Sequence, residues 1–240
     1  MLNKSYELFQ DLGVLEEMKE KFVRKPGVTF TNPANTTSSQ WNFKDVINDE
    51  SYLSFHVKRN EFDEILLNNS RKNGCQVIEE AFVKDISFKK TLNQVQLEIK
   101  LSNNKYIQVT SKFLIDASGQ KSILGNIHQT KETWNNLPPR IAMFAFWKGR
   151  IKDKLLKEGN LKIVNLGIEG GGWMWMIPLE KDLLSVGIVT TNKFYNKQRK
   201  SSKTNEKWIE DFYSDLIMQT PVASNVLQHF SMTTDLTINS

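Results

Sequence analysis

Two short stretches contain residue types that could hold or shield a reactive ligand. The first is FLIDASGQKS, residues 113–122, in which an apolar run ends at an aspartate and continues into small residues. Small side chains let a ligand approach backbone N–H groups closely. The alternative is an ordinary turn between a strand and a loop. The candidate binding residues in this stretch are Asp116, Ala117, Ser118 and Gly119.

The second stretch is GGWMWMIPL, residues 171–179, which places two tryptophans one residue apart. A strand points alternate side chains to opposite faces. Trp173, Trp175 and Ile177 therefore share one face, and the two methionines between them take the other. Pro178 suits an edge or the end of a strand. The alternative is that both tryptophans are core aromatics of a sheet.

The composition indicates a globular protein without metal or disulfide chemistry. The chain has 240 residues, of which 39% are hydrophobic and 25% charged, and its net charge is +5. The basic residues are scattered among acids, which favours solubility over nucleic-acid binding. The single cysteine, Cys75, excludes an internal disulfide and is expected to fill a core, and the three histidines lie far apart. We expect no metal site.

No stretch has the apolar length of a signal peptide or of a membrane span. We therefore expect a soluble, cytoplasmic protein.

The first half of the chain predicts helices, a strand and a β-meander. Residues 5–22 suggest short helices broken at Gly13. A strand at 52–57 precedes a helix that ends with Gly74 in the C′ position. In NQVQLEIKLSNNKYIQVTSKFLIDAS the alternating residues 95–101, the polar turn SNNK and the return of Ile107 and Val109 predict a β-meander, and 113–118 reads as a buried strand.

The second half predicts three strands and a helix. The strands are RIAMFAFWKG, GGWMWMIPL and LLSVGIVTT, and the helix lies in NEKWIEDFYSDLIMQTP, where Pro221 stops it. A boundary is expected near residue 125.

This order of parts resembles a known family. The motifs are RNEFDEILL after a "VxR" segment, then DASG, then GGWMWMIPL. In this order they resemble the FAD-dependent halogenase branch of the para-hydroxybenzoate-hydroxylase-type flavoproteins, alongside geranylgeranyl-reductase-like relatives. The resemblance implies an α/β (α+β) fold. Residues 51–125 would form part of a Rossmann-like FAD-binding domain with a β-meander. Residues 1–50 and 126–240 would form a mixed-sheet substrate side.

The resemblance also implies which residues meet FAD. Arg59 would lie on its phosphate or adenosine side, although a surface arginine paired with Glu61 or Asp63 is the alternative. Val83 would hold the adenine through backbone groups, and the turn at residues 116–119 would line the cofactor. Related hydroxylases have an arginine where this chain has Gly125. This difference puts direct NAD(P)H use in doubt, so the electron source is either NAD(P)H or a flavin reductase.

A halogenase also needs a lysine between flavin and substrate. This lysine hydrogen-bonds hypohalous acid or forms a haloamine with it. In KPGVTF, Lys25 matches that lysine by resemblance, and a solvated lysine is the alternative. The resemblance further implies that the indole strand, Trp173 to Pro178, crowds the flavin so that an organic substrate cannot reach it directly.

The expected function is halide oxidation through a flavin hydroperoxide, with relay of the halogen by Lys25 to a small aromatic or carrier-bound substrate. An FAD-dependent monooxygenase or a geranylgeranyl-reductase-like enzyme is the alternative, and a catalytically silent remnant is another. No GxGxxG occurs in these 240 residues, so we expect an interior part of a longer flavoprotein.

Overall fold

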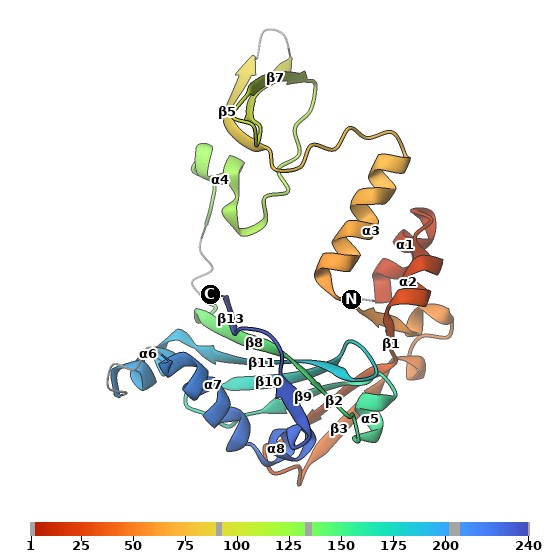
Figure 1. The fold of residues 1–240 in the computed structure, drawn as a ribbon, viewed down its shortest axis with the longest axis vertical. Coiled ribbons are helices and arrows are strands. Elements are labelled where there is room, and N and C mark those ends of the chain that lie inside the picture. Colours follow the sequence, from red (N-terminus) through yellow and green to blue (C-terminus); the bar gives the residue numbers. More distant parts are fainter. Residues whose placement is uncertain (1–2, 90–92, 133–135, 202–206, 240) are drawn as a thin grey trace. The chain divides into compact units, whose positions relative to one another are not determined.

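The computed structural model describes residues 3–89, 93–132, 136–201 and 207–239. The chain divides into two compact units, Met1–Asn69 with Leu137–Ser240 and Ser70–Asn136, and each is described by itself (Figure 1). The division expected from the resemblance, with residues 51–125 on the cofactor side, concerns functional roles and stays a prediction.

The larger unit is built on an eight-stranded sheet with the order β12-β8-β11-β10-β9-β2-β3, to which β13 adds on β8. The pair β2–β9 is parallel and the other pairs are antiparallel, so the sheet is mixed, as expected. Its strands are β2 (Gly27–Thr31), β3 (Ser38–Asn42), β8 (Arg140–Gly149), β9 (Leu161–Asn165), β10 (Gly172–Pro178), β11 (Leu183–Thr191), β12 (Phe230–Met232) and β13 (Thr237–Asn239).

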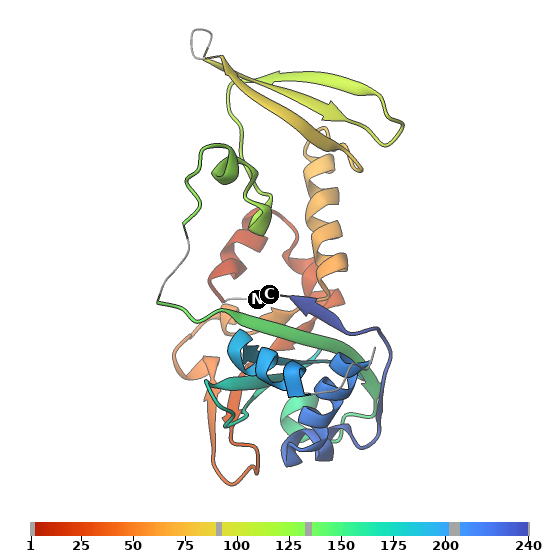
Figure 2. The ribbon, with the colours of Figure 1, turned by 90° about the vertical axis from the view of Figure 1, so that its left-hand side faces the viewer.

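Helices cover one face of this sheet. They are α5 (Lys154–Lys157), α6 (Asn192–Ser201), α7 (Trp208–Met218) and α8 (Pro221–Leu227). Figure 2 shows α7 and α8, in blue, below the green strand β8. Side chains from α7 and α8 pack with sheet residues such as Met174 and Met176 into one buried cluster. Tyr213 of α7 donates a hydrogen bond to the Val186 carbonyl oxygen at 2.8 Å, and burial raises the pKa of this tyrosine to about 12.

A second core lies among the N-terminal elements. These are η1 (Asn3–Ser5), α1 (Tyr6–Asp11), α2 (Leu15–Lys21), β1 (Val23–Lys25), η2 (Phe43–Asp45), η3 (Glu50–Tyr52), β4 (Ser54–His56) and α3 (Arg59–Lys72). Phe9, Met18, Phe55 and Phe62 are among its buried residues. The predicted break between α1 and α2 at Gly13 is confirmed, with φ at +70°.

The smaller unit contains the predicted meander of β5 (Phe82–Lys89), β6 (Gln94–Lys100) and β7 (Tyr106–Ser111), followed by η5 (Gly119–Lys121) and α4 (Ile123–Ile127). The end of α3 also follows the sequence. Gly74 has a φ of +86°, and the N–H groups of Gly74 and Cys75 donate to the carbonyls of Arg71 and Ser70 at 3.0 and 3.1 Å. This pattern is a Schellman cap.

Two expectations about the smaller unit are wrong. Residues 113–118 form no strand, and Phe113 and Ile115 are 86% and 87% exposed. A strand needs a hydrogen-bonding neighbour, and the three-stranded sheet of this unit ends at β7 without pairing this segment. Cys75 is exposed rather than in a core, because the residues after Gly74 leave the helix without entering a strand.

Among the residues that the structure describes, no helix combines the length and the apolar character needed to cross a bilayer.

Candidate functional site

The strand β10 alternates as its sequence predicts. Met174 and Met176 are fully buried on the helix-covered face of the sheet. Trp173, Trp175 and Ile177 are half-buried on the opposite face. The predicted sharing of one face is therefore confirmed, whereas the roles of these residues toward a cofactor stay predictions.

The Trp175 indole is held in place from three sides. Its Nε1–H donates a hydrogen bond to the Ser185 hydroxyl oxygen at 3.2 Å, and its ring centroid lies 6.1 Å from that of Phe144. The indole also lies across Gly187, the residue directly opposite on β11, so closely that a Cβ atom there would overlap the ring. A glycine is therefore required at position 187 for this arrangement.

Strand register extends this face into an apolar strip. Ile163 of β9 lies opposite Trp175, and Phe30 of β2 lies opposite Ile163. On the other side, Phe144 and Phe146 of β8 lie in line with Trp175 and Ile177 across β11. The sequence analysis did not assign these neighbours, although the alternation in RIAMFAFWKG already set both phenylalanines on one face. We call this set the aromatic strip: Phe30, Phe144, Phe146, Ile163, Trp173, Trp175 and Ile177.

Lys25 lies just before the first residue pairs of β2. Because β2 is parallel to β9 and β9 is antiparallel to β10, the start of β2 meets the end of β10 at the same end of the sheet. The pairs Val28 with Leu161 and Met176 with Lys162 fix this relation. The backbone of Lys25 thus reaches the end of the aromatic strip that finishes at Ile177 and Pro178.

The Lys25 side chain is half-buried in a mostly neutral setting. Its Nζ atom lies 5.2 Å from the centre of the Phe43 ring. Burial lowers the pKa of Lys25, and within the described part of the chain no carboxylate lies within ion-pair distance of its amine. A buried ammonium without a counter-ion is costly, so the neutral amine is favoured more than in an exposed lysine.

His56 shares one face of the β1–β4 pair with Lys25, since Val23 lies opposite His56 and Lys25 opposite Ser54. Its Nε2–H donates to the Gly159 carbonyl oxygen at 3.0 Å, which fixes the proton on that nitrogen. Burial, followed by the charge of Lys25, lowers the pKa of His56 to about 3. The imidazole is therefore neutral at ordinary pH.

Arg59 begins α3 at the same end of the sheet. The preceding residue, Lys58, forms ion pairs with Glu61 and with Glu180, which follows the end of β10. The guanidinium of Arg59 contacts the Asp63 carboxylate at 3.1 Å, and its side chain is 76% exposed. This is the surface ion pair that the sequence left open as the alternative. A role toward a phosphate stays a prediction.

The predicted binding turn in the smaller unit is organised by its own side chains. The Asp116 carboxylate accepts hydrogen bonds from the N–H groups of Ser118 at 2.9 Å and Leu124 at 2.8 Å, and the Ser118 hydroxyl accepts one from Ile123 at 3.0 Å. The bonds from Ser118 and Leu124 lower the pKa of Asp116. Ala117 and Gly119 are exposed.

Val83 lies in β5 opposite Ile99, where the pairing with β6 shifts register. The expected contacts of Val83 and of the turn at residues 116–119 with a cofactor stay predictions.

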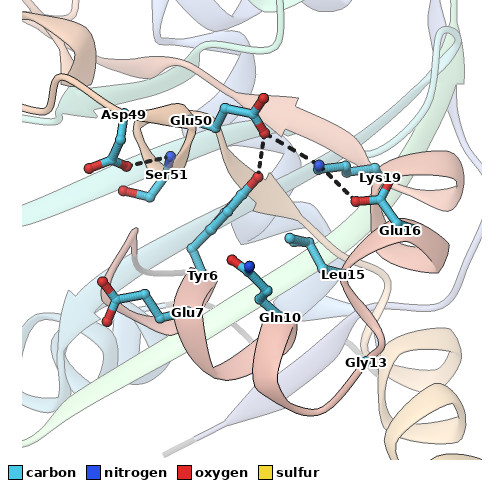
Figure 3. A pocket seen from close by; sticks show the side chains of 10 residues that line it. All are labelled: Tyr6, Glu7, Gln10, Gly13, Leu15, Glu16, Lys19, Asp49, Glu50 and Ser51. Atoms are coloured by element: carbon cyan, nitrogen blue, oxygen red, sulfur yellow. Dashed lines mark hydrogen bonds and ion pairs between the residues drawn. The ribbon is translucent and has the colours of Figure 1, made fainter.

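A separate hollow of about 510 Å³ lies between the N-terminal helices and residues 49–51. Figure 3 shows the side chains that line it. Lys19 forms ion pairs with Glu16 and Glu50 there. The Tyr6 hydroxyl donates to Glu50 at 2.9 Å, and Lys19 donates to Glu16 at 2.8 Å, which raises the pKa of this lysine. None of the predicted site residues lines this hollow, so we regard it as a surface network that joins α1, α2 and η3.

Comparison with known proteins agrees with this architecture. The sequence profile of the tryptophan halogenase family matches residues 15–219. Tryptophan 2-halogenase of Chondromyces crocatus is 28% identical over 174 residues, which cover 72% of this chain and 32% of that enzyme. The 1H-pyrrole-2-carbonyl-[peptidyl-carrier protein] brominase of Pseudoalteromonas luteoviolacea is 30% identical over 204 residues, 84% of this chain and 47% of that enzyme. The chain thus spans less than half the length of either relative.

Among solved structures, the flavin-dependent halogenase CmlS superposes with a TM-score of 0.82 at 23% identity, over 99% of this chain and 41% of that protein. At this identity the likeness shows the fold, and it confirms the expected α/β (α+β) class. The profile match covers well over half of the sequence. The chain belongs to the tryptophan halogenase family.

Proposed function

We propose that this chain forms the substrate side and part of the cofactor side of an FAD-dependent halogenase, in which Lys25 transfers the halogen. The observation that carries this proposal is a half-buried lysine at the end of an aromatic strip, with no carboxylate partner among the residues that the structure describes. A lysine that serves only solubility would be exposed or paired. Family membership supplies the second support.

FAD fits the residues that are present. The half-exposed indoles of Trp173 and Trp175 offer an apolar surface against which a flat ring could lie. We propose that Arg59, Val83 and the turn from Asp116 to Gly119 contact the cofactor. An exposed ion pair such as Arg59–Asp63 contributes little, so Arg59 could change partners at small cost. When bound, FAD would supply the oxidation of halide by dioxygen. The electrons would come from a flavin reductase or NAD(P)H.

The neutral amine of Lys25 suits the transfer step. Its nitrogen lone pair attacks the halogen of hypohalous acid; an N–halogen bond forms, and the oxygen leaves as water with the amine proton. An electron-rich aromatic carbon then takes the halogen, the amine regains a proton, and the ring loses one. Because burial lowers the pKa of Lys25, more of it is in the reactive form at a given pH.

The indoles of Trp173 and Trp175 would separate the halogen transfer at Lys25 from the flavin. Trp175 is fixed by Ser185, Phe144 and Gly187, so its ring cannot easily swing aside. A rigid aromatic wall would admit a small oxidant and exclude an aromatic substrate. We propose a small aromatic substrate, either free or bound to a carrier.

Halide dependence tests this function against a monooxygenase on the same fold. The protein that contains this chain is supplied with FAD, a flavin reductase, NADH and indole as the aromatic acceptor. We expect halogenated indole with bromide or chloride and no oxidised product when halide is omitted. Hydroxylated indole that forms equally without halide would instead establish a monooxygenase. FAD binding without any product from indole in either condition would contradict the proposed transfer to small aromatics, and failure to bind FAD would favour a silent protein.

A further inference from the structure

The turn between α5 and β9 lies against the strand that carries Lys25. At Gly159 this turn has no space for a side chain, because a Cβ atom there would overlap the carbonyl oxygen of Arg24. The same Cβ atom would lie 3.3 Å from a methyl group of Val23. The Arg24 carbonyl belongs to the peptide unit that joins Arg24 to Lys25. The turn therefore contacts the backbone from which the Lys25 side chain extends.

A hydrogen bond attaches the turn to the other strand of this pair. His56 of β4 donates through Nε2 to the Gly159 carbonyl oxygen at 3.0 Å, and both residues are buried. Val23 lies opposite His56, and the side chains of both share one face of the strand pair with Lys25. The turn thus covers part of the face on which the lysine lies.

The turn is braced at both of its ends. Gly159 has a φ of +88° after the end of α5, and the N–H of Asn160 donates to the Leu155 carbonyl at 2.8 Å. This bond closes a helix cap that favours glycine, because other residues are strained in the left-handed region. Asp153 accepts a hydrogen bond at the start of α5 and forms an ion pair with the buried Lys162 of β9.

The surroundings of the lysine on this face carry little charge. In the strand pair the titratable residues on this face are Lys25 and His56, and the imidazole is neutral at ordinary pH. The charged residues of η2 and of the turn are exposed, namely Lys44, Asp45, Lys157 and Glu158. The turn therefore acts on the amine by excluding water rather than by supplying a charge.

We propose that Gly159 is a positioning residue for the amine of Lys25. By packing against the peptide between Arg24 and Lys25, it sets where the lysine side chain begins and keeps water from the face on which it lies. That the amine so placed transfers halogen rests on the proposed function. The placement itself does not.

The test compares Gly159→Ala with Gly13→Ala. Both glycines have a positive φ, +88° and +70°, so alanine is strained at each, but a Cβ atom at position 13 would meet open space. The first readout is the pKa of the Lys25 amine, followed by NMR of lysines that carry isotope-labelled methyl groups. The Lys25 signal is the one that Lys25→Met removes. Gly159→Ala should raise this pKa toward that of an exposed lysine, because a displaced turn admits water, and Gly13→Ala should leave it unchanged.

The second readout is the yield of halogenated indole per FAD reoxidised. A displaced peptide moves the amine from its working position, so Gly159→Ala should lower this ratio about tenfold or more while FAD reoxidation continues. Gly13→Ala should keep the full ratio.

Two variants of His56 test the same contact with the glycine in place. A glutamine can donate to the Gly159 carbonyl as the imidazole does, whereas a leucine of similar size cannot. His56→Leu should loosen the turn and raise the pKa of Lys25, and His56→Gln should retain the pKa of the unaltered protein. This pair decides the question even where Gly159→Ala does not fold. An unchanged Lys25 pKa in Gly159→Ala, or an equal pKa in the two His56 variants, would overturn the positioning role.

The two proposals fail separately. A raised Lys25 pKa in Gly159→Ala, without halide-dependent turnover by the unaltered protein, leaves the positioning role standing and removes the halogenase. Halogenation that requires Lys25, with a Lys25 pKa and a yield that Gly159→Ala does not change, does the reverse.

Discussion

At the scale of single residues, the pair Lys25 and His56 is the most unusual feature of the site. Two basic side chains lie on one face of a short strand pair, and burial lowers the pKa of each. The charge of Lys25 also makes the charged form of His56 more costly, because like charges repel. His56 is thus a neutral side chain at ordinary pH on the same strand face as the lysine.

This arrangement predicts acid lability that His56 controls. The folded pKa of about 3 lies below the ordinary 6.5, so the unfolded chain binds the extra proton between these values. The contribution of His56 to the free energy of unfolding is therefore fully present above pH 6.5. It falls by about 1.4 kcal/mol per pH unit as the pH drops toward 3. His56→Gln should flatten this fall in urea unfolding at pH 7.0, 5.5 and 4.5. The exposed His229, replaced by Gln, is the control, and an unchanged slope in His56→Gln would contradict the assignment.

From the sequence, Lys25 could be identified as the candidate halogen-transfer lysine only because it stands in the segment KPGVTF. Its contact with Phe43 and its shared face with His56 join residues that are distant in sequence, and the pairing of β1 with β4 sets that shared face. The Asp116 turn shows the same limit. Small residues were visible in DASG, but not that the aspartate would satisfy the N–H groups of Ser118 and Leu124 itself.

At the scale of elements, β10 and β11 act as one unit around Trp175. The glycine at position 187 leaves the space in which the indole lies. Gly187→Ala should displace the ring and lower the free energy of unfolding by about 1–3 kcal/mol, as overpacking does. Urea unfolding and tryptophan fluorescence measure both effects.

A double-mutant cycle supplies the control for this prediction. In a Trp175→Ala background the indole is gone, so Gly187→Ala should cost much less there than in the unaltered protein. Equal costs in the two backgrounds would show that the alanine is disfavoured for another reason.

Strands with clear alternation were predictable, and an apolar run was not. β8 and β10 follow from a period of two, because each buries one face against the helices, whereas the apolar strand β11 is buried on both faces. The run at 113–118 has apolar residues but no partner strand in its unit, and it lies exposed. An apolar run in the sequence indicates that its side chains tend to be buried. A strand also requires a neighbouring strand with which its backbone can form hydrogen bonds.

At the scale of the whole molecule, the order of motifs predicted more than any motif alone. The family profile extends over 15–219 and confirms the membership that RNEFDEILL, DASG and GGWMWMIPL together suggested. A hollow on the larger unit that is lined by Phe30, Ile163 and Trp173 was not predictable, since these residues come from three different strands. Register across the mixed sheet brings them together.

The central claim, that the Lys25 amine delivers the halogen, is tested most directly by the yield of halogenated indole per FAD reoxidised. We predict that Lys25→Met lowers this ratio by at least about 100-fold, since a methionine cannot form the N–halogen bond, while FAD reoxidation continues at its normal rate. The exposed Lys44, replaced by Met, should keep the full ratio. A Lys25→Met protein that halogenates indole with an unchanged ratio would contradict the account.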